Sequence, residues 1–248
     1  MRPYVTLFIQ CLLDTFHPAA CQSMLDVFKH LDVPVIIPKN QTCCGQPAFN
    51  AGYRLEARKA ASHFLDVFQN SDVIVCPSGS CVYMIRHHYP LLFKNDPVRL
   101  NRVREICTRI YEFSEFLVDV LGIVDVGSVY SGQVTYHDSC HLARGLGIRE
   151  QPRQLIRHAS GATLVEMPDS DRCCGFGGAF SIKYPDISSA LVDDKVRDIL
   201  DSGADTVVGC DMGCLMNIEG RLSRMGSGIR VLHIAELLAN GLGKVSRT

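Results

Sequence analysis

The stretch QTCCGQPAF at residues 41–49 recurs in outline as DRCCGFGGAF at residues 171–180. Each copy carries an adjacent cysteine pair followed by glycine, with one single cysteine before it and another after it along the chain. Thiolates are soft ligands that bind iron–sulfur clusters, zinc or copper(I), and four of them can enclose one metal centre. The sequence therefore predicts two copies of one thiolate site. The first set is Cys11, Cys43, Cys44 and Cys81, and the second is Cys140, Cys173, Cys174 and Cys214.

The repeat extends beyond the cysteines. YVTLFIQC at residues 4–11 matches QVTYHDSC at 133–140, and SDVIVCPSGSC at 71–81 matches ADTVVGCDMGC at 204–214. A duplicated scaffold arises by chance less easily than a duplicated dipeptide. We therefore predict two modules, residues 1–127 and 128–248, that arose by internal duplication.

Short β-branched runs alternate with helical patterns along both halves. The predicted buried strands are residues 5–9, 35–37, 73–75, 134–136, 163–165 and 206–208, and the clearest helical patterns lie at 21–28, 57–68 and 191–200. This alternation predicts an α/β fold with mainly parallel strands and flanking helices. Such sheets bind ligands at the carboxyl ends of their strands. Since the cysteines of both sets follow predicted strands, we expect them to converge at one edge.

Composition excludes several classes of protein. The chain has 248 residues, 47% of them hydrophobic, and a formal net charge of −1. The near-zero charge and the absence of a basic stretch argue against nucleic acid as a partner. No apolar run approaches the ~20 residues of a membrane span. Twelve cysteines in a chain with an ample core fit the reduced cytoplasm better than a secreted disulfide scaffold.

The metal itself is left open by the spacing. Structural zinc sites usually combine two close CxxC-type pairs, whereas each set here combines an adjacent pair with two distant single cysteines. This spacing favours iron–sulfur clusters, and zinc is the alternative. There is no GxGxxG after a strand and no GxxxxGK[ST], so nucleotide cofactors lack support.

Four cysteines lie outside the two sets. Cys76 and Cys210 adjoin the predicted sites and are interpreted either as extra ligands or as packing residues. Cys21 and Cys107 lie in apolar helical stripes, the latter among Val103, Ile106, Ile110, Phe113 and Leu117, and are assigned to packing. Two histidines, His137 and His141, flank Cys140, where either could donate a hydrogen bond to a cluster sulfur or shuttle a proton.

The paired modules, with VTYHDSCHLARGLGI at 134–148, CCGFGGAFS at 173–181 and DMGCLMN at 211–217, resemble the cysteine-rich CCG-domain family. This family includes the CCG-containing subunit of heterodisulfide reductase and the iron–sulfur subunit of glycolate oxidase, and the chain most resembles its lactate utilization branch. The resemblance implies a cytoplasmic iron–sulfur protein with two clusters, of 4Fe–4S type, on the two cysteine sets. It also implies two sister subunits, lactate utilization proteins B and C, and oxidation of L-lactate to pyruvate by the complex.

One departure from the wider family bears on function. The heterodisulfide reductase relatives have a fifth cysteine in each set, and Ser78 and Asp211 occupy those positions here. The departure disfavours the non-cubane cluster of those relatives and its disulfide-cleaving chemistry. A heterodisulfide or thiol–disulfide reductase subunit remains the alternative enzyme, and a zinc-stiffened interaction module the alternative without enzymatic activity.

Overall fold

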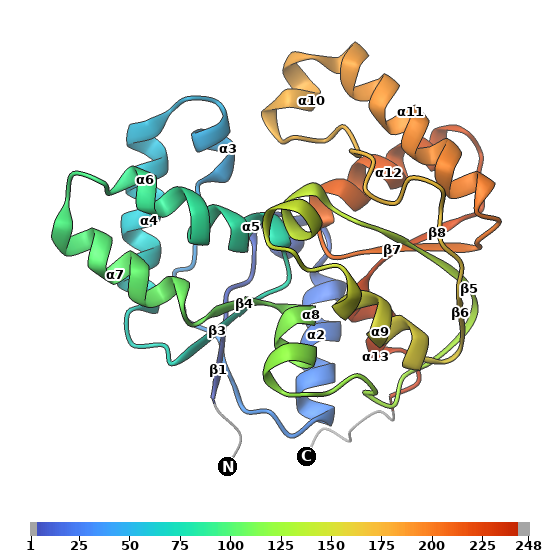
Figure 1. The fold of residues 1–248 in the computed structure, drawn as a ribbon, viewed down its shortest axis with the longest axis horizontal. Coiled ribbons are helices and arrows are strands. Elements are labelled where there is room, and N and C mark those ends of the chain that lie inside the picture. The colour runs from blue at the N-terminus through green and yellow to red at the C-terminus, as the bar shows by residue number, and fades with distance from the viewer. Residues whose placement is uncertain (1–3, 243–248) are drawn as a thin grey trace.

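The computed structural model describes residues 4–242, which form two four-stranded parallel sheets flanked by helices (Figure 1). The first sheet has the order β2-β1-β3-β4 and the second β6-β5-β7-β8. The strands are β1 (Val5–Leu7), β2 (Val35–Ile36), β3 (Val73–Cys76), β4 (Ile110–Glu112), β5 (Val129–His137), β6 (Ser160–Leu164), β7 (Thr206–Gly209) and β8 (Arg230–His233). Both sheets thus place their strands in the same order, and the predicted duplicated α/β fold is confirmed.

The helices follow the strands in matching positions of the two halves. In the first half they are α1 (Cys11–Phe16), α2 (Pro18–His30), α3 (Gln46–Asn50), α4 (Arg54–Phe68), α5 (Gly79–Tyr83), η1 (Met84–His88), α6 (Tyr89–Leu92), α7 (Pro97–Cys107), α8 (Phe113–Glu115) and η2 (Phe116–Val120). In the second half they are η3 (His141–Gly145), α9 (Glu150–His158), α10 (Ala179–Lys183), α11 (Pro185–Asp201), α12 (Met212–Arg224) and α13 (Ile234–Ala239). No helix within residues 4–242 is both long enough and apolar enough to span a bilayer.

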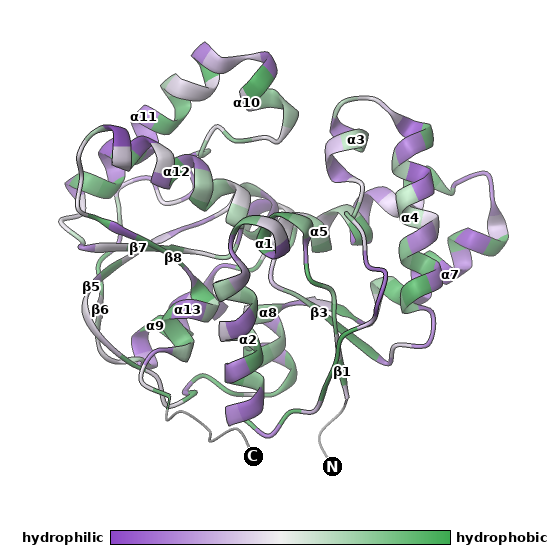
Figure 2. Ribbon diagram, turned by 180° about the vertical axis from the view of Figure 1, so that it is seen from behind, coloured by the Kyte–Doolittle hydropathy of each residue, from purple (hydrophilic) through white to green (hydrophobic). Residues whose placement is uncertain are grey.

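All six predicted strands and the three predicted helical segments are present. Figure 2 shows green and purple alternating along α2 and α4, as expected for helices that bury one face. The helical stripe predicted from Val103 to Leu117 is wrong, because α7 ends at Cys107 and the chain then forms strand β4. Cys21 is buried in α2 as predicted.

The two halves share a core in which helices pair reciprocally. Helix α2 packs on α13, and α9 packs on α8 and η2, so each contact joins the helix between the first two strands of one half to the last helix of the other. The rings of Phe28 and Phe113 meet edge to face at 5.4 Å within this core. The predicted module boundary near Gly127 falls in the link between η2 and β5. It remains a prediction.

Strand order explains where the cysteines converge. From β1 the chain goes to β2 on one side and then returns to β3 on the other, so a crevice opens at the carboxyl ends of β1 and β3. Strands β5 and β7 repeat this arrangement. Cys11 and Cys81 follow the first pair of strands, and Cys140 and Cys214 follow the second.

Candidate metal centre

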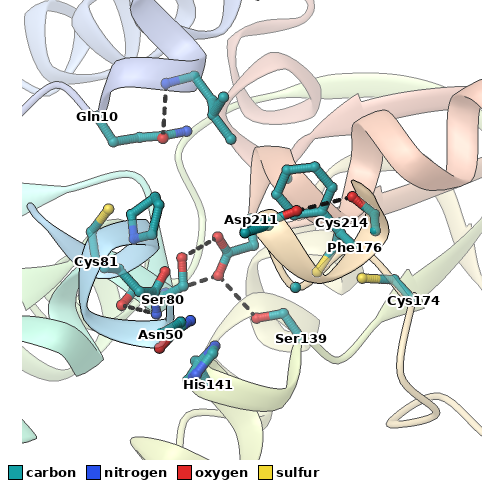
Figure 3. Close-up of a pocket in the computed structure, with 18 of the residues that line it drawn as sticks. Gln10, Asn50, Ser80, Cys81, Ser139, His141, Cys174, Phe176, Asp211 and Cys214 are labelled. Carbon is teal, nitrogen blue, oxygen red and sulfur yellow. Dashed lines mark hydrogen bonds between the residues drawn. The ribbon is translucent and has the colours of Figure 1, made fainter. Parts of the chain in front are cut away.

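All eight cysteines of the two predicted sets line one cavity of about 490 Å³. Figure 3 shows part of its wall, with Cys81 on one side and Cys174 and Cys214 on the other. Segments from both halves form its wall, and Leu12, Pro47, Phe176 and Ile182 supply much of the apolar lining. The convergence predicted from the strand ends is therefore observed, and it is closer than expected. The two sets face a single cavity.

Each CCG turn depends on its glycine. Gly45 and Gly175 have φ values of 84° and 79°, a conformation that side chains disfavour. A Cβ on Gly175 would also lie 2.5 Å from the carbonyl oxygen of Ser188, so the turn has no room for one. The two glycine N–H groups donate to Cys43 Sγ and Cys173 Sγ, at 3.4 Å in each half. The turn thus presents both sulfurs of a pair and supplies one donor to the first of them.

The sulfurs within a set interact strongly. Hydrogen bonds from Cys11 and Cys44 lower the pKa of Cys43 to about 3, with further help from the Gly45 N–H. Cys44 and Cys174 are buried, whereas Cys43 and Cys173 are half-buried, so each pair has an inner and an outer sulfur. All four residues of each set line the same cavity, so their side chains converge there. Four thiolates with this placement are a suitable donor set for a metal centre.

A buried carboxylate separates the two cysteine sets. Asp211 precedes α12 and accepts hydrogen bonds from Ser80 N at 2.8 Å, Ser80 Oγ at 2.7 Å, Ser78 Oγ at 3.1 Å and Ser139 Oγ at 3.2 Å (Figure 3). Burial raises the pKa of this carboxyl. Because Ser78 and Ser80 flank the start of α5 and Ser139 precedes Cys140, Asp211 links the segments that carry three of the predicted ligands.

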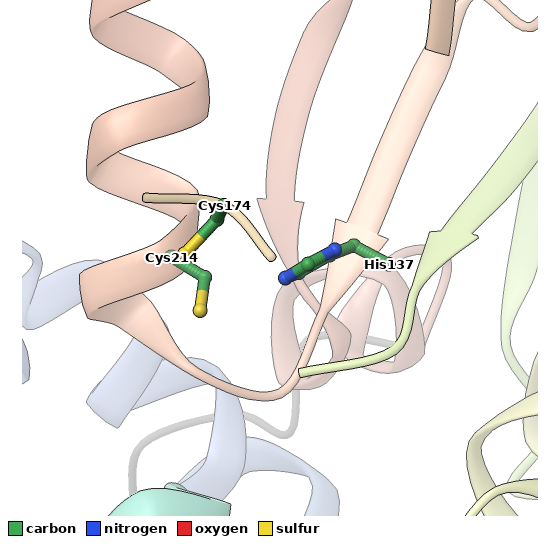
Figure 4. A group of neighbouring side chains, drawn as sticks. All are labelled: His137, Cys174 and Cys214. Atoms are coloured by element: carbon green, nitrogen blue, oxygen red, sulfur yellow. The ribbon is translucent and has the colours of Figure 1, made fainter. Parts of the chain in front are cut away.

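The environment of His137 indicates whether a metal centre fits the second cysteine set. Its side chain is 1% exposed, and neither ring nitrogen has a hydrogen-bond partner within residues 4–242. The imidazole points toward Cys174 and Cys214, and the ligand atoms of the three residues lie within 4.8 Å of one another (Figure 4). Burial lowers the pKa of His137 to about 3, so the ring is neutral. An orphaned polar group is costly, and a metal centre in the cage would give it a partner.

The other flanking histidine lies nearer the rim. His141 Nδ1 is 3.8 Å from Cys140 Sγ, and its ring contacts Tyr83 from the first half at 5.0 Å between centroids. It lines the cavity, and its role as a hydrogen-bond donor or proton shuttle remains a prediction.

Cys76 and Cys210 are not counterparts of each other. In the repeat, Cys76 matches Gly209 and Cys210 matches Pro77. Cys76 lies in the same buried cluster as Cys81 but does not line the cavity. Cys210 lies in the core between the halves, where Tyr136 Oη donates to its sulfur at 3.3 Å. Their placement therefore favours packing for Cys210, and the ligand role of either residue remains a prediction.

A buried polar network, which sequence reasoning missed, supports the second CCG turn. Arg153 forms two hydrogen bonds to Asp138, at 2.7 and 2.9 Å, and these side chains are 8% and 1% exposed. Asp138 N and Asp138 Oδ2 both bond to Ser170, and buried Lys195 donates to the carbonyls of Asp169 and Ser170. Hydrogen bonds with Asp138, Arg153 and Lys195 thus hold the loop that leads to Cys173. Only an arginine on an otherwise apolar helix face signals this network in the sequence.

Comparison with known proteins agrees with this architecture. Residues 5–86 and 134–219 each match the cysteine-rich CCG domain. Lactate utilization protein A of Exiguobacterium sp. is 47% identical over 97% of this chain and 98% of that protein. The protein of that name from Bacillus cereus strain G9842 is 44% identical over 94% of this chain and 98% of its own length. The chain therefore belongs to the family of lactate utilization protein A, among the proteins with paired cysteine-rich CCG domains.

A solved structure shares the fold. The crystal structure of a hypothetical protein from Helicobacter pylori superposes with a TM-score of 0.65 at 11% identity. The match covers 98% of this chain and 50% of that one, so this chain spans half the length of that protein. At this identity the likeness concerns the fold alone.

Proposed function

We propose that this chain is an iron–sulfur electron-transfer subunit of a multi-subunit system that oxidises L-lactate to pyruvate. The single observation that carries the proposal is the placement of two four-cysteine sets on one cavity, in a chain whose relatives are named for lactate utilization. The proposed cofactors are two 4Fe–4S clusters, one on each set. When bound, they would supply one-electron redox chemistry, which suits the two electrons released when lactate becomes pyruvate and two protons.

The chain's own residues hold and shield the proposed clusters. The four sulfurs of each set would be the ligands, and the N–H groups of Gly45 and Gly175 direct positive charge at the outer sulfur of each pair. Hydrogen bonds to sulfur and exclusion of water both tune the reduction potential of such centres. Leu12 and Phe176 are partly buried apolar residues that line the cavity.

The proposed partners are lactate utilization proteins B and C, and L-lactate would be a substrate of the complex. As a subunit of such an L-lactate dehydrogenase complex, the chain would act in the cytoplasm. Because eight of the twelve cysteines would be cluster ligands, the proposal requires a compartment in which they stay reduced.

Zinc is the second candidate, and one observation favours it. His137, Cys174 and Cys214 form a mixed imidazole and thiolate trio, a donor set common in structural zinc sites. The alternative of a heterodisulfide or thiol–disulfide reductase subunit gains no such support. Ser78 and Asp211, which hold the positions of the fifth cysteines, are hydrogen-bonded to each other and leave no thiolate there.

Reconstitution tests the proposed division of labour. The chain would be purified anaerobically, alone and with the two sister subunits, and L-lactate-dependent reduction of an artificial acceptor would be measured. We expect activity in the three-subunit system and little in the isolated chain. Full oxidation of lactate by the isolated chain would refute the proposal, as would an active two-subunit system that lacks this chain.

A further inference from the structure

The walls behind the two cysteine sets differ at one repeated position. Phe8 in the first half and His137 in the second occupy the same place in the matching segments 4–11 and 133–140. Phe8 is fully buried and packs edge to face on Phe64 at 4.9 Å and on Phe68 at 5.5 Å. The apolar ring of Phe8 therefore lies behind the first cysteine set, and the imidazole of His137 lies at the same position behind the second.

The strand next to this position differs as well. His137 pairs in register with Gly209 of β7, whereas the residue that matches Gly209 in the first half is Cys76. The first set thus has an additional thiol beside Cys81, and the second has an additional ring nitrogen beside Cys174 and Cys214. The duplication has kept the ligands and changed the groups behind them.

The partners that the surroundings of His137 leave for its ring are the sulfurs of Cys174 and Cys214. The charged groups that face it are Lys195 and Asp138, and both are committed elsewhere, Lys195 to backbone carbonyls and Asp138 to Arg153. Neither ring nitrogen has a hydrogen-bond partner within the described chain, and the ring points at Cys174 and Cys214 (Figure 4). Any N–H that the ring carries on that side is directed at sulfur.

We infer that His137 is a positioning residue of the second centre, where it donates a hydrogen bond to the sulfur of Cys174 or Cys214 and raises the reduction potential of this centre. The inference rests on the proposed iron–sulfur function. A donor at sulfur stabilises the extra negative charge of the reduced state, which raises the potential. Phe8 offers no donor to the first centre. The hydrogen bond thus favours the reduced state of the second centre, with no bond formed or broken.

Pulsed EPR of the anaerobic protein reduced with dithionite tests the contact directly. With ¹⁵N-labelled histidine, we expect a weak nitrogen coupling at one reduced centre, and in His137→Phe this coupling should fall to what His141, beside Cys140, contributes. A strong coupling, as from a directly bound nitrogen, would overturn the inference by making His137 a ligand. Coupling to neither centre would overturn it as well.

A redox titration followed by EPR tests the consequence. In His137→Phe, which copies the first half, the midpoint potential of one centre should fall and that of the other should stay constant. His137→Gln retains an N–H donor and should restore part of the shift. His158→Phe, an exposed position on α9, is the control. Unchanged potentials in His137→Phe with iron and sulfide retained would overturn the inference. Zinc without sulfide in the wild-type protein would instead refute the proposed function.

Discussion

The Ser78 hydroxyl donates a hydrogen bond to Asp211 Oδ1 at 3.1 Å, although 133 positions separate the two residues. They occupy the same place in the two halves of the repeat, so the contact joins matching residues. Ser78 caps α5, which carries Cys81, and Asp211 precedes α12, which carries Cys214. The two cysteine sets are thus coupled through hydrogen bonds that Asp211 accepts from Ser78 and Ser80 of the first half.

Removing the Asp211 carboxylate should therefore affect both sets. Asp211→Ala leaves Ser80 N and the hydroxyls of Ser78 and Ser139 without their acceptor, and buried donors without partners are costly. We expect the free energy of unfolding to fall by about 2–4 kcal/mol and iron to be lost from both centres. Urea unfolding and iron analysis under anaerobic conditions measure this. Exposed Asp186→Ala is the control, and a loss confined to one centre would contradict the coupling.

Removing the outer sulfur of one cysteine set should leave the metal of the other set in place. Cys43→Ser removes a ligand from the first set and Cys173→Ser the equivalent ligand from the second. Each variant should lose about half of the iron, and each should lose a different EPR signal. Loss of all iron in either single variant would argue against two separate sites.

Ligand and bystander cysteines should behave differently. Replacing Cys81 or Cys214 should empty a centre, because both line the cavity. Cys76→Ala and Cys210→Ala should retain both centres and lose only about 1 kcal/mol of stability, as expected for a small buried hydrophobe. Iron content and EPR of the four variants decide the matter. If Cys76→Ala and Cys81→Ala both emptied the first centre, a five-cysteine site would be indicated.

Arg153 should matter far more than its neighbour Arg157. Arg153→Met leaves buried Asp138 uncompensated, which should cost about 3–5 kcal/mol and reduce iron only at the second centre. Arg157→Met, on the same helix, removes an exposed ion pair with Glu150 and should cost less than about 1 kcal/mol. Equal losses in the two variants, measured by urea unfolding, would show that the buried network does not support the loop before Cys173.

The contribution of Glu112 to stability should fall as the pH rises through neutrality. Burial raises the pKa of Glu112 to about 7, although hydrogen bonds from Ser114 and Glu115 oppose the shift. An unfolded glutamate titrates near ~4.3. The folded chain therefore holds a proton that the unfolded chain releases, so this contribution is complete at low pH and is lost through about pH 7.

Glu112→Gln isolates this contribution, because the amide does not titrate. Between pH 6 and pH 8, the wild type should lose about 1 kcal/mol more unfolding free energy than the variant. Anaerobic urea unfolding at the two pH values gives the difference. An equal pH dependence in both proteins would show that Glu112 is ionised in the folded state.

Local patterns predicted most of the fold and all eight cavity cysteines. The strand runs, the helical stripes and the repeated CCG turns are short-range signals, and a parallel sheet brings strand ends together. Strand β4 was missed because Ile110 and Phe113 continue the helical spacing of α7, so its pattern does not distinguish strand from helix. Glu112 with Glu115 and His233 with Glu236 form capping boxes where each final helix begins. Glutamate and histidine are not the usual N-cap residues, so the sequence pattern alone does not mark these starts.

Other features of the site depend on contacts distant in sequence. The bond between Asp211 and Ser78 and the union of both sets in one cavity follow from how the halves pack, which no local pattern encodes. His137 was singled out as a neighbour of Cys140, but its contact partners are Cys174 and Cys214. These two cysteines lie 37 and 77 positions further along the chain, so only the folded structure brings them to the ring.

Metal analysis of the anaerobically purified chain tests the central claim most directly. Iron, acid-labile sulfide and zinc would be measured on the same sample, together with EPR after reduction. Two 4Fe–4S clusters predict about eight iron and eight sulfide per chain, with two interacting EPR signals and little zinc. Stoichiometric zinc without sulfide, or iron for one cluster only in fully loaded protein, would contradict the account.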